Sequence, residues 1–189
     1  MQAPILRDIA SELQTPRLTL RTPRFGDGKV VYEAVQESVE LLRQWPASLP
    51  WAVPEPSNAA SETFCREAMA GFARRTVLNY LVFETETGSF VASTSLHDID
   101  WKVPRFELGF WCTTSKQRCG YMKEALSALE EYAFVELGAR RVDAITDEQN
   151  IASKRLCQSL GMHIEGIHRN AIITPTGELR NSCTLAVVR

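Results

Sequence analysis

The chain has 189 residues, 44% hydrophobic and 23% charged, and its 21 Lys plus Arg against 23 Asp plus Glu leave a formal net charge of −2. This length predicts one domain spanning residues 1–189, large enough to bury a core without metal or disulfide staples. The composition excludes a wholly disordered chain, and the near-neutral charge argues against a dedicated nucleic-acid binder, which would carry a basic excess.

The sequence shows no pattern typical of a membrane span, an export signal or a metal site. No apolar run approaches the roughly 18 to 20 residues that cross a bilayer. Arg7, Asp8 and Glu12 interrupt the stretch in which a secretory signal would be apolar. The five cysteines form no CxxC pair and have no nearby His at metal-ligand spacing. We therefore expect a cytoplasmic protein with no membrane partner, no disulfide framework and no metal.

In chain order, the first half predicts strands and helices on either side of an aromatic loop. The expected elements are strand 17–21, helix 30–35, loop 45–56, helix 57–75, and strands 80–83 and 90–96. Alternation of apolar and polar side chains indicates the first strand, and apolar residues at helical spacing indicate the helices. The loop contains two Trp and four Pro, which disfavour a long helix or a central strand.

The second half alternates strands with helices and closes with a hairpin. The expected elements are strand 105–112, helix 120–136, strand 141–146, helix 152–160, and strands 163–173 and 179–187. Gly138 and Gly161 end the two helices, because glycine adopts a left-handed cap most easily. Both strand-helix-strand crossovers imply locally parallel pairing. The sequence therefore predicts an α/β domain with a mixed, mostly antiparallel sheet of about six to seven strands flanked by helices.

Residues 117–122 form the most informative stretch, between a strand that ends near Cys112 and a helix that begins near Gly120. Unpaired backbone N–H groups and the positive end of the helix dipole favour an anion such as pyrophosphate at such a place. Gly120 lets the backbone approach phosphates closely, and Arg118 adds positive charge. A glycine before a helix is also common in a simple turn, so these residues alone leave both interpretations open.

Several short segments along the chain, including part of residues 117–122, occur in an informative order and spacing. They are 15–21, Trp45, 107–111, 117–121, 150–153, 160–162 and Gly177. Together they resemble the GCN5-related N-acetyltransferase (GNAT) superfamily, in particular its RimJ/RimL-like branch of ribosomal-protein N-terminal acetyltransferases. The resemblance covers most of the chain. It implies a sheet splayed between the strand that ends at Cys112 and the strand that ends at Thr146.

The resemblance also implies that acetyl-coenzyme A (acetyl-CoA) binds in the splay. Its pantetheine arm would pair with the backbone of one parted strand, and its pyrophosphate would meet the backbone N–H groups of the loop. A crevice at strand ends beside a helix start is where an anionic cofactor commonly binds. The cofactor-binding residues expected from this resemblance are Phe110, Trp111, Cys112, Gln117, Arg118, Cys119, Gly120, Tyr121, Met122, Asn150 and Ser153.

The reaction implied by the resemblance is direct attack of a neutral amine on the thioester, which requires a base, an oxyanion donor and an acid. We expect Glu107 to be the base, acting directly or through water, and a backbone N–H near Trp111 to be the oxyanion donor. Ser153 is the expected acid for the departing thiolate. Alternatively, Glu107 is a structural carboxylate and Ser153 only hydrogen-bonds the backbone of its helix.

Four residues are candidates for the acceptor site. Trp45 and Trp51 are expected to form a wall of that site, with a core-capping or dimer-contact role as the alternative, and His97 is a candidate pocket residue. Arg180 can bind a carboxylate or phosphate, or else pair with a surface acid. Because Arg180 stands where relatives often carry an acidic residue, acetylation of a polyamine loses support.

The sequence therefore predicts an acetyl-CoA-dependent N-acetyltransferase that acts on a primary amine, either a protein N-terminus or a small amino compound. Two alternatives remain open. One is a non-catalytic acyl-CoA-binding or protein-interaction module of the same fold. The other is a resistance-type acetyltransferase that modifies an antibiotic or toxin. The sequence does not decide between a monomer and a homodimer.

Overall fold

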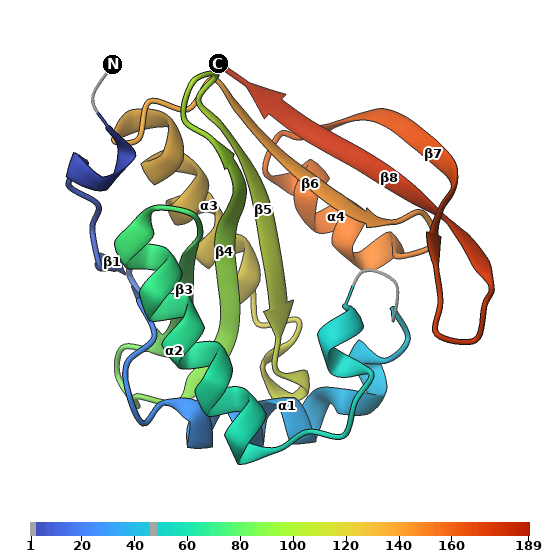
Figure 1. Cartoon of the computed structure of the whole chain (residues 1–189), viewed down its shortest axis with the longest axis horizontal. Helices are drawn as coiled ribbons and strands as arrows, with labels where there is room; N and C mark the ends of the chain where they lie inside the picture. Colours follow the sequence, from blue (N-terminus) through green and yellow to red (C-terminus); the bar gives the residue numbers. More distant parts are fainter. Residues whose placement is uncertain (1–2, 46–48) are drawn as a thin grey trace.

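A mixed sheet of eight strands organises the chain (Figure 1). The structure is a computed structural model that describes residues 3–45 and 49–189. The strands are β1 (Glu12–Gln14), β2 (Leu18–Arg21), β3 (Leu78–Glu84), β4 (Phe90–Asp100), β5 (Arg105–Cys112), β6 (Arg141–Asp147), β7 (His163–Ile173) and β8 (Leu179–Val188). The α-helices are α1 (Gly28–Leu42), α2 (Asn58–Arg74), α3 (Tyr121–Val135) and α4 (Ile151–Ser159). Short 3-10 turns are η1 (Pro4–Leu6), η2 (Pro50–Ala52) and η3 (Thr114–Lys116). None of the helices within the described ranges is long and apolar enough to span a membrane.

The strands lie side by side in the order β1-β2-β3-β4-β5-β6-β8-β7. Every neighbouring pair is antiparallel except β5 with β6, so the predicted mixed, mostly antiparallel sheet is confirmed. The sheet gains β1, whose three residues are too few for a recognisable alternation. The prediction that both crossovers give paired parallel strands is wrong for the second one, because β8 lies between β6 and β7.

Alternation along the strands separates two layers of side chains. On β3, Tyr80 belongs to a buried cluster with Leu126 of α3, whereas its neighbour Leu81 packs with Val31 and Val35 of α1. Adjacent residues of a strand point to opposite faces of the sheet, so α3 covers one face and α1 the other. Figure 1 shows α2 in front of the sheet and α3 behind it.

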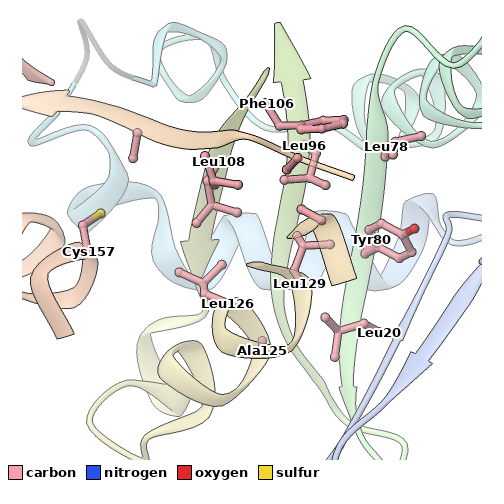
Figure 2. Close-up of a cluster of buried hydrophobic side chains, with 14 of the residues drawn as sticks. Leu20, Leu78, Tyr80, Leu96, Phe106, Leu108, Ala125, Leu126, Leu129 and Cys157 are labelled. Atoms are coloured by element: carbon pink, nitrogen blue, oxygen red, sulfur yellow. The ribbon is translucent and has the colours of Figure 1, made fainter. Parts of the chain in front are cut away.

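The larger buried cluster fixes α3 against the sheet (Figure 2). Leu126 and Leu129 of α3 are fully buried together with Leu20 of β2 and Leu96 of β4. Full burial of one such leucine stabilises the folded state by about 1.5–3 kcal/mol relative to its exposure. This packing holds the first turn of α3 beside the end of β5, where the predicted anion-binding loop lies.

The predicted splay of the sheet is confirmed between β5 and β6. Their parallel pairing runs only from Arg105 opposite Arg141 to Glu107 opposite Asp143. Beyond that point β5 stays paired with β4 as far as Cys112, and β6 stays paired with β8 as far as Asp147. The two strands therefore part after Glu107, and Figure 1 shows them separating toward their C-terminal ends.

Candidate active site

A cavity of about 120 Å³ occupies the place where β5 and β6 part. Residues 108–110 of β5 and 144–146 of β6 line its two sides, and Asn150, Ser153 and Cys157 line it from α4 and the turn before it. Over these residues each strand has lost its partner on the side that faces the gap. An extended chain of matching length can therefore complete the interrupted pairing there, as the predicted pantetheine arm requires.

The loop between η3 and α3 opens beside this gap. Gly120 precedes the helix with φ +79°, and Arg118 has φ +59°, so both lie in the left-handed region. Within the described part of the chain, no acceptor is bonded to the backbone N–H groups of residues 118–122. Free N–H groups at the start of a 15-residue helix favour a bound anion. The loop thus fits the predicted pyrophosphate site.

Arg17, just before β2, holds this loop in shape. Its guanidinium donates to the carbonyl oxygen of Cys119 at 3.1 Å, forms an ion pair with Glu124 at 2.7 Å and stacks over the ring of Tyr121. With the carbonyl of Cys119 bound to Arg17, that peptide oxygen is held away from an incoming anion. The sequence pattern places Arg17 only in a strand and gives no sign of this contact, because the two segments lie about 100 residues apart in the chain.

Tyr121 contributes to the loop through a second anchor. Its hydroxyl donates to Glu84, which also accepts hydrogen bonds from Thr87 and Lys116, and these donors lower the pKa of Glu84 to about 2. The same carboxylate raises the pKa of the Tyr121 hydroxyl. Tyr121 therefore fixes the start of α3 to the end of β3, and the loop can keep one conformation before a ligand arrives.

Glu107 and His97 form a polar pair at the inner end of the gap. They lie opposite each other on β5 and β4, with His97 Nε2 at 3.3 Å from Glu107 Oε1. His97 Nδ1 lies 3.3 Å from Ser95 Oγ on its other side. The Glu107 side chain is 18% exposed and lines the cavity between the strands. A carboxylate in this position can accept a proton from a group that enters the gap.

Asn150 and Ser153 lie together at the start of α4. The Asn150 side-chain oxygen caps the helix by accepting a hydrogen bond from the Ser153 backbone N–H at 3.0 Å. This cap turns the helix so that both residues line the gap. Among the described residues, none hydrogen-bonds the Ser153 hydroxyl, so it is not bound to the backbone of its own helix as the alternative interpretation required.

A second and larger cavity, of about 570 Å³, lies on the face of the sheet that α1 and α2 cover. Leu49, His97, Gly109 and Phe110 line both this cavity and the gap, so the two spaces meet there. Gly109 keeps the junction open, because a Cβ at this position would lie 2.8 Å from Ser95 Oγ and 2.9 Å from His97 Cε1. An isolated glycine inside a strand signals such close approach, and sequence analysis overlooked it.

The site therefore combines three features: the gap between β5 and β6, the start of α3 with its free backbone N–H groups, and the second cavity. The Glu107 carboxylate lies where the gap and the second cavity meet. Residues 17–163 match the family model described as Acetyltransferase (GNAT) domain. The chain belongs to the GNAT acetyltransferase family. The match confirms the inferred resemblance to the GNAT superfamily and makes N-acetyltransferase the enzyme class of this GNAT protein.

Individual relatives agree with this assignment. YoaA of Bacillus subtilis, an uncharacterised N-acetyltransferase, is 24% identical over 83% of this chain and 85% of its own length. Among solved structures, the microcin C7 self-immunity acetyltransferase MccE with acetyl-CoA and AMP superposes with a TM-score of 0.86 at 17% identity, covering 96% of this chain and 98% of that one. RimL, the ribosomal L7/L12 α-N-protein acetyltransferase, with coenzyme A superposes with a TM-score of 0.83 at 19% identity, covering 92% and 95%. These structural likenesses show the fold.

The predicted acceptor residues of this GNAT protein do not gather in one place. Trp45 and His97 line the gap, whereas Trp51 lines only the second cavity and packs against Trp111 with ring centroids 5.6 Å apart. Trp45 and Trp51 therefore do not form a common wall. Arg180 lines neither cavity, because it is bound to Asp147 at 3.0 Å and to Gln149 at 2.9 Å. The Arg180 guanidinium is thus engaged in an internal ion pair with Asp147, and its binding of a substrate anion stays a prediction.

The remaining predicted cofactor residues fall into two groups. Gln117, Arg118, Cys119, Gly120 and Met122 lie in or beside the loop that precedes α3. Phe110, Trp111 and Cys112 form the last residues of β5, beyond the end of its pairing with β6. The Cys112 thiol is half-buried, and burial raises its pKa to about 11, so it stays protonated and unreactive at neutral pH.

Proposed function

We propose that this protein transfers the acetyl group of acetyl-CoA to a primary amine, with Glu107 as the general base. The observation that carries the proposal is the position of the Glu107–His97 pair where the gap and the second cavity meet. A donor in the gap and an acceptor in the second cavity would meet beside this carboxylate. A non-catalytic binding module has no use for a partly exposed carboxylate at that junction.

The residues of this chain fit acetyl-CoA. Free N–H groups of residues 118–122 would bind the pyrophosphate, and the unpaired edge of β5 at residues 110–112 would bind the pantetheine arm. Asn150 and Ser153 would contact the arm near its sulfur end. When bound, acetyl-CoA supplies a thioester whose carbonyl carbon accepts the amine nitrogen. The support for this assignment is the family, together with the coenzyme in the RimL and MccE structures.

In the proposed reaction the amine nitrogen forms a bond to carbon as the carbon–sulfur bond breaks. Glu107 accepts the proton that the ammonium group must lose, directly or through one water, and His97 holds the carboxylate toward the junction. A backbone N–H near Trp111 donates to the carbonyl oxygen as negative charge develops there. Ser153 would donate a proton to the departing sulfur and regain one from the acylated nitrogen, which has a second proton to lose. The acceptor is a protein N-terminal α-amine or a small amino compound.

The test combines Glu107→Gln with a matched control, Glu67→Gln, an exposed glutamate on α2. We expect Glu107→Gln to lower kcat by about 100-fold or more, because general-base catalysis contributes roughly 10²–10⁴-fold. Acetyl-CoA affinity, measured by calorimetry, should stay unchanged in both variants. Unchanged turnover in Glu107→Gln would remove Glu107 from the base role. Absence of saturable acetyl-CoA binding to the native protein would overturn the proposed function itself.

A further inference from the structure

The second cavity carries information about the acceptor. Its volume of about 570 Å³ lies within the range of roughly 300–1,000 Å³ found for small-molecule sites. The floor is formed by β3, β4 and β5, and the cover by α1, α2 and the segment around η2. This cavity is distinct from the gap that the acetyl donor would occupy, although the two share a junction.

Apolar side chains dominate the lining of this cavity. They come from both helices, from the loop around η2 and from β5, and include Val31, Val35, Trp51, Pro54, Pro56, Phe64 and Trp111. The polar residues on the floor are Asn79, Ser93, Thr94 and Ser95, together with His97 at the junction with the gap. A lining of this kind stabilises a bound apolar body by removing its surface from water.

Charge in the lining excludes several classes of acceptor. Among the described residues that line the cavity, none is Lys or Arg, and Glu55 is the single acid. The Glu55 side chain is 88% exposed and already paired with Arg43 at 2.9 Å. A phosphate or carboxylate on the acceptor would therefore find no Lys or Arg, and the one His of the lining, His97, is already paired with Glu107. A second ammonium group would find no free carboxylate. Burial of such a charge without a partner is costly.

The aromatic pair at the outer end suits a planar group. Trp51 and Trp111 have ring centroids 5.6 Å apart and planes inclined by 49°, and the ring of Phe90 also packs against Trp111 at 5.7 Å. Trp51 is 46% exposed and belongs to the short turn η2. Aromatic rings are stabilised by offset or edge contacts beyond the area they bury. At the inner end of the cavity, the acceptor amine would lie beside His97 and Glu107.

We infer that the acceptor is a primary amine carried on an uncharged apolar or aromatic body, and that this body fills the cavity between Trp111 and the α1–α2 cover while the amine reaches Glu107. The inference rests on the proposed function and narrows it to a class of substrate. The body is either that of a small amine or the first side chain of a polypeptide. Both sources present the same chemistry to the cavity.

A panel of amines with acetyl-CoA at saturation tests this inference. The small-molecule arm compares 2-phenylethylamine with 1,4-diaminobutane and O-phosphoethanolamine. The peptide arm compares tetrapeptides whose free N-terminal residue is Phe, Lys or Asp. We expect kcat/KM for the phenyl compound in at least one arm to exceed that of its charged counterparts by about tenfold or more. Whichever arm is faster identifies the source of the amine, and either result supports the inference.

Two alanines on the first turn of α2 provide a matched pair of variants. Ala60 lines the cavity and Ala59 does not, and both are exposed, so an acid at either position suits the helix start equally. We expect Ala60→Asp to raise kcat/KM for 1,4-diaminobutane relative to 2-phenylethylamine by about tenfold, because the new carboxylate supplies the partner that a second ammonium group lacks. Ala59→Asp should leave that ratio unchanged.

A binding measurement tests the inferred acceptor class independently of acetyl transfer. Titration of the protein without acetyl-CoA should show saturable quenching or enhancement of tryptophan fluorescence by 2-phenylethylamine, and Trp51→Ala should weaken it. Acetylation of the charged compounds as fast as or faster than the phenyl compound in both arms would overturn the inference and leave the proposed function intact. Absence of acetyl transfer to every amine in the panel would instead overturn the proposed function.

Discussion

His97 Nε2 lies 3.3 Å from Glu107 Oε1 across the β4–β5 pair, at the junction of the two cavities. The register of these strands places the two residues directly opposite each other, so their contact is fixed by the sheet itself. Ser95 contacts the other ring nitrogen of His97 and limits rotation of the ring. His97 is therefore a positioning residue for the proposed base.

The role of His97 predicts a graded loss of activity. We expect His97→Ala to lower kcat by about tenfold, a fraction of the roughly 10²–10⁴-fold that general-base catalysis supplies. His97→Gln retains a donor that can reach Glu107, so it should recover part of that loss. KM for acetyl-CoA should not change in either variant. Steady-state kinetics that show equal losses for Ala and Gln would contradict a positioning role.

Ser153 offers a test on the opposite side of the gap. Removal of its hydroxyl in Ser153→Ala keeps the backbone N–H that Asn150 caps, so α4 should stay folded. We expect kcat to fall by about 10- to 100-fold, because proton donation to the departing sulfur is lost. Ser159→Ala, which removes an exposed hydroxyl at the other end of α4, is the control. If both variants have native kcat, Ser153 is not the acid.

Gly109 allows a test of the junction between the cavities. Gly109→Ala would place a Cβ at 2.8 Å from Ser95 Oγ and 2.9 Å from His97 Cε1, so the His97 ring must shift. We expect acetyl transfer to decrease by about tenfold or more while acetyl-CoA binding by calorimetry persists. Gly166→Ala in β7 is the control, since the nearest atom to its added Cβ is 3.8 Å away. Full activity of Gly109→Ala would show that the junction has more room than this geometry allows.

Glu84 predicts a pH dependence of stability. Its hydrogen bonds lower its pKa to about 2 from an ordinary value of 4.5. A carboxyl whose folded-state pKa is lowered contributes stability that is fully present above about pH 4.5 and is lost as the pH falls toward 2. Glu84→Gln should therefore lower the melting temperature at pH 7 and flatten its decline between pH 4.5 and 2. The neighbouring exposed Glu86→Gln should follow the native curve in the same thermal melts.

The packing of α3 predicts the cost of disturbing the core. Leu126 is fully buried against the sheet, so Leu126→Ala should reduce the free energy of unfolding by about 2–5 kcal/mol. Val135→Ala, at an exposed position near the end of the same helix, should cost less than about 0.5 kcal/mol. Urea unfolding of both variants measures the difference. Similar midpoints for the two would contradict the assigned burial of Leu126.

The order of elements along the chain was predictable because it depends on local patterns. The strand at 105–112 and the helices around Leu126 and Cys157 follow from alternation and helical spacing within each segment. Spatial order is different, since the insertion of β8 between β6 and β7 depends on pairing between segments that are far apart. No local pattern shows that β8 has a neighbouring strand on both sides. The strands of the second crossover were predicted to pair with each other for that reason.

The candidate site was likewise predictable only where it depends on local sequence patterns. The loop at Gly120 was recognisable from a glycine before a helix and from the family resemblance. The Glu107–His97 contact depends on strand register, and the hold of Arg17 on the loop depends on contacts between distant segments, so neither was readable. The second cavity is formed by five different elements together with the η2 turn, and its apolar character emerges only when they assemble.

The position of β8 between β6 and β7 has a consequence for folding during translation. Strand β6 emerges from the ribosome about 40 residues before its lasting neighbour β8, which pairs with it from Asp147 to Arg141. Until residues 179–188 have been synthesised, β6, which forms one side of the donor-binding gap, lacks its partner β8. Nascent β6 and β7 then expose unpaired strand edges that can form incorrect pairings. A nascent chain stalled before β8 should thus be unable to retain acetyl-CoA, however well its N-terminal strands have folded.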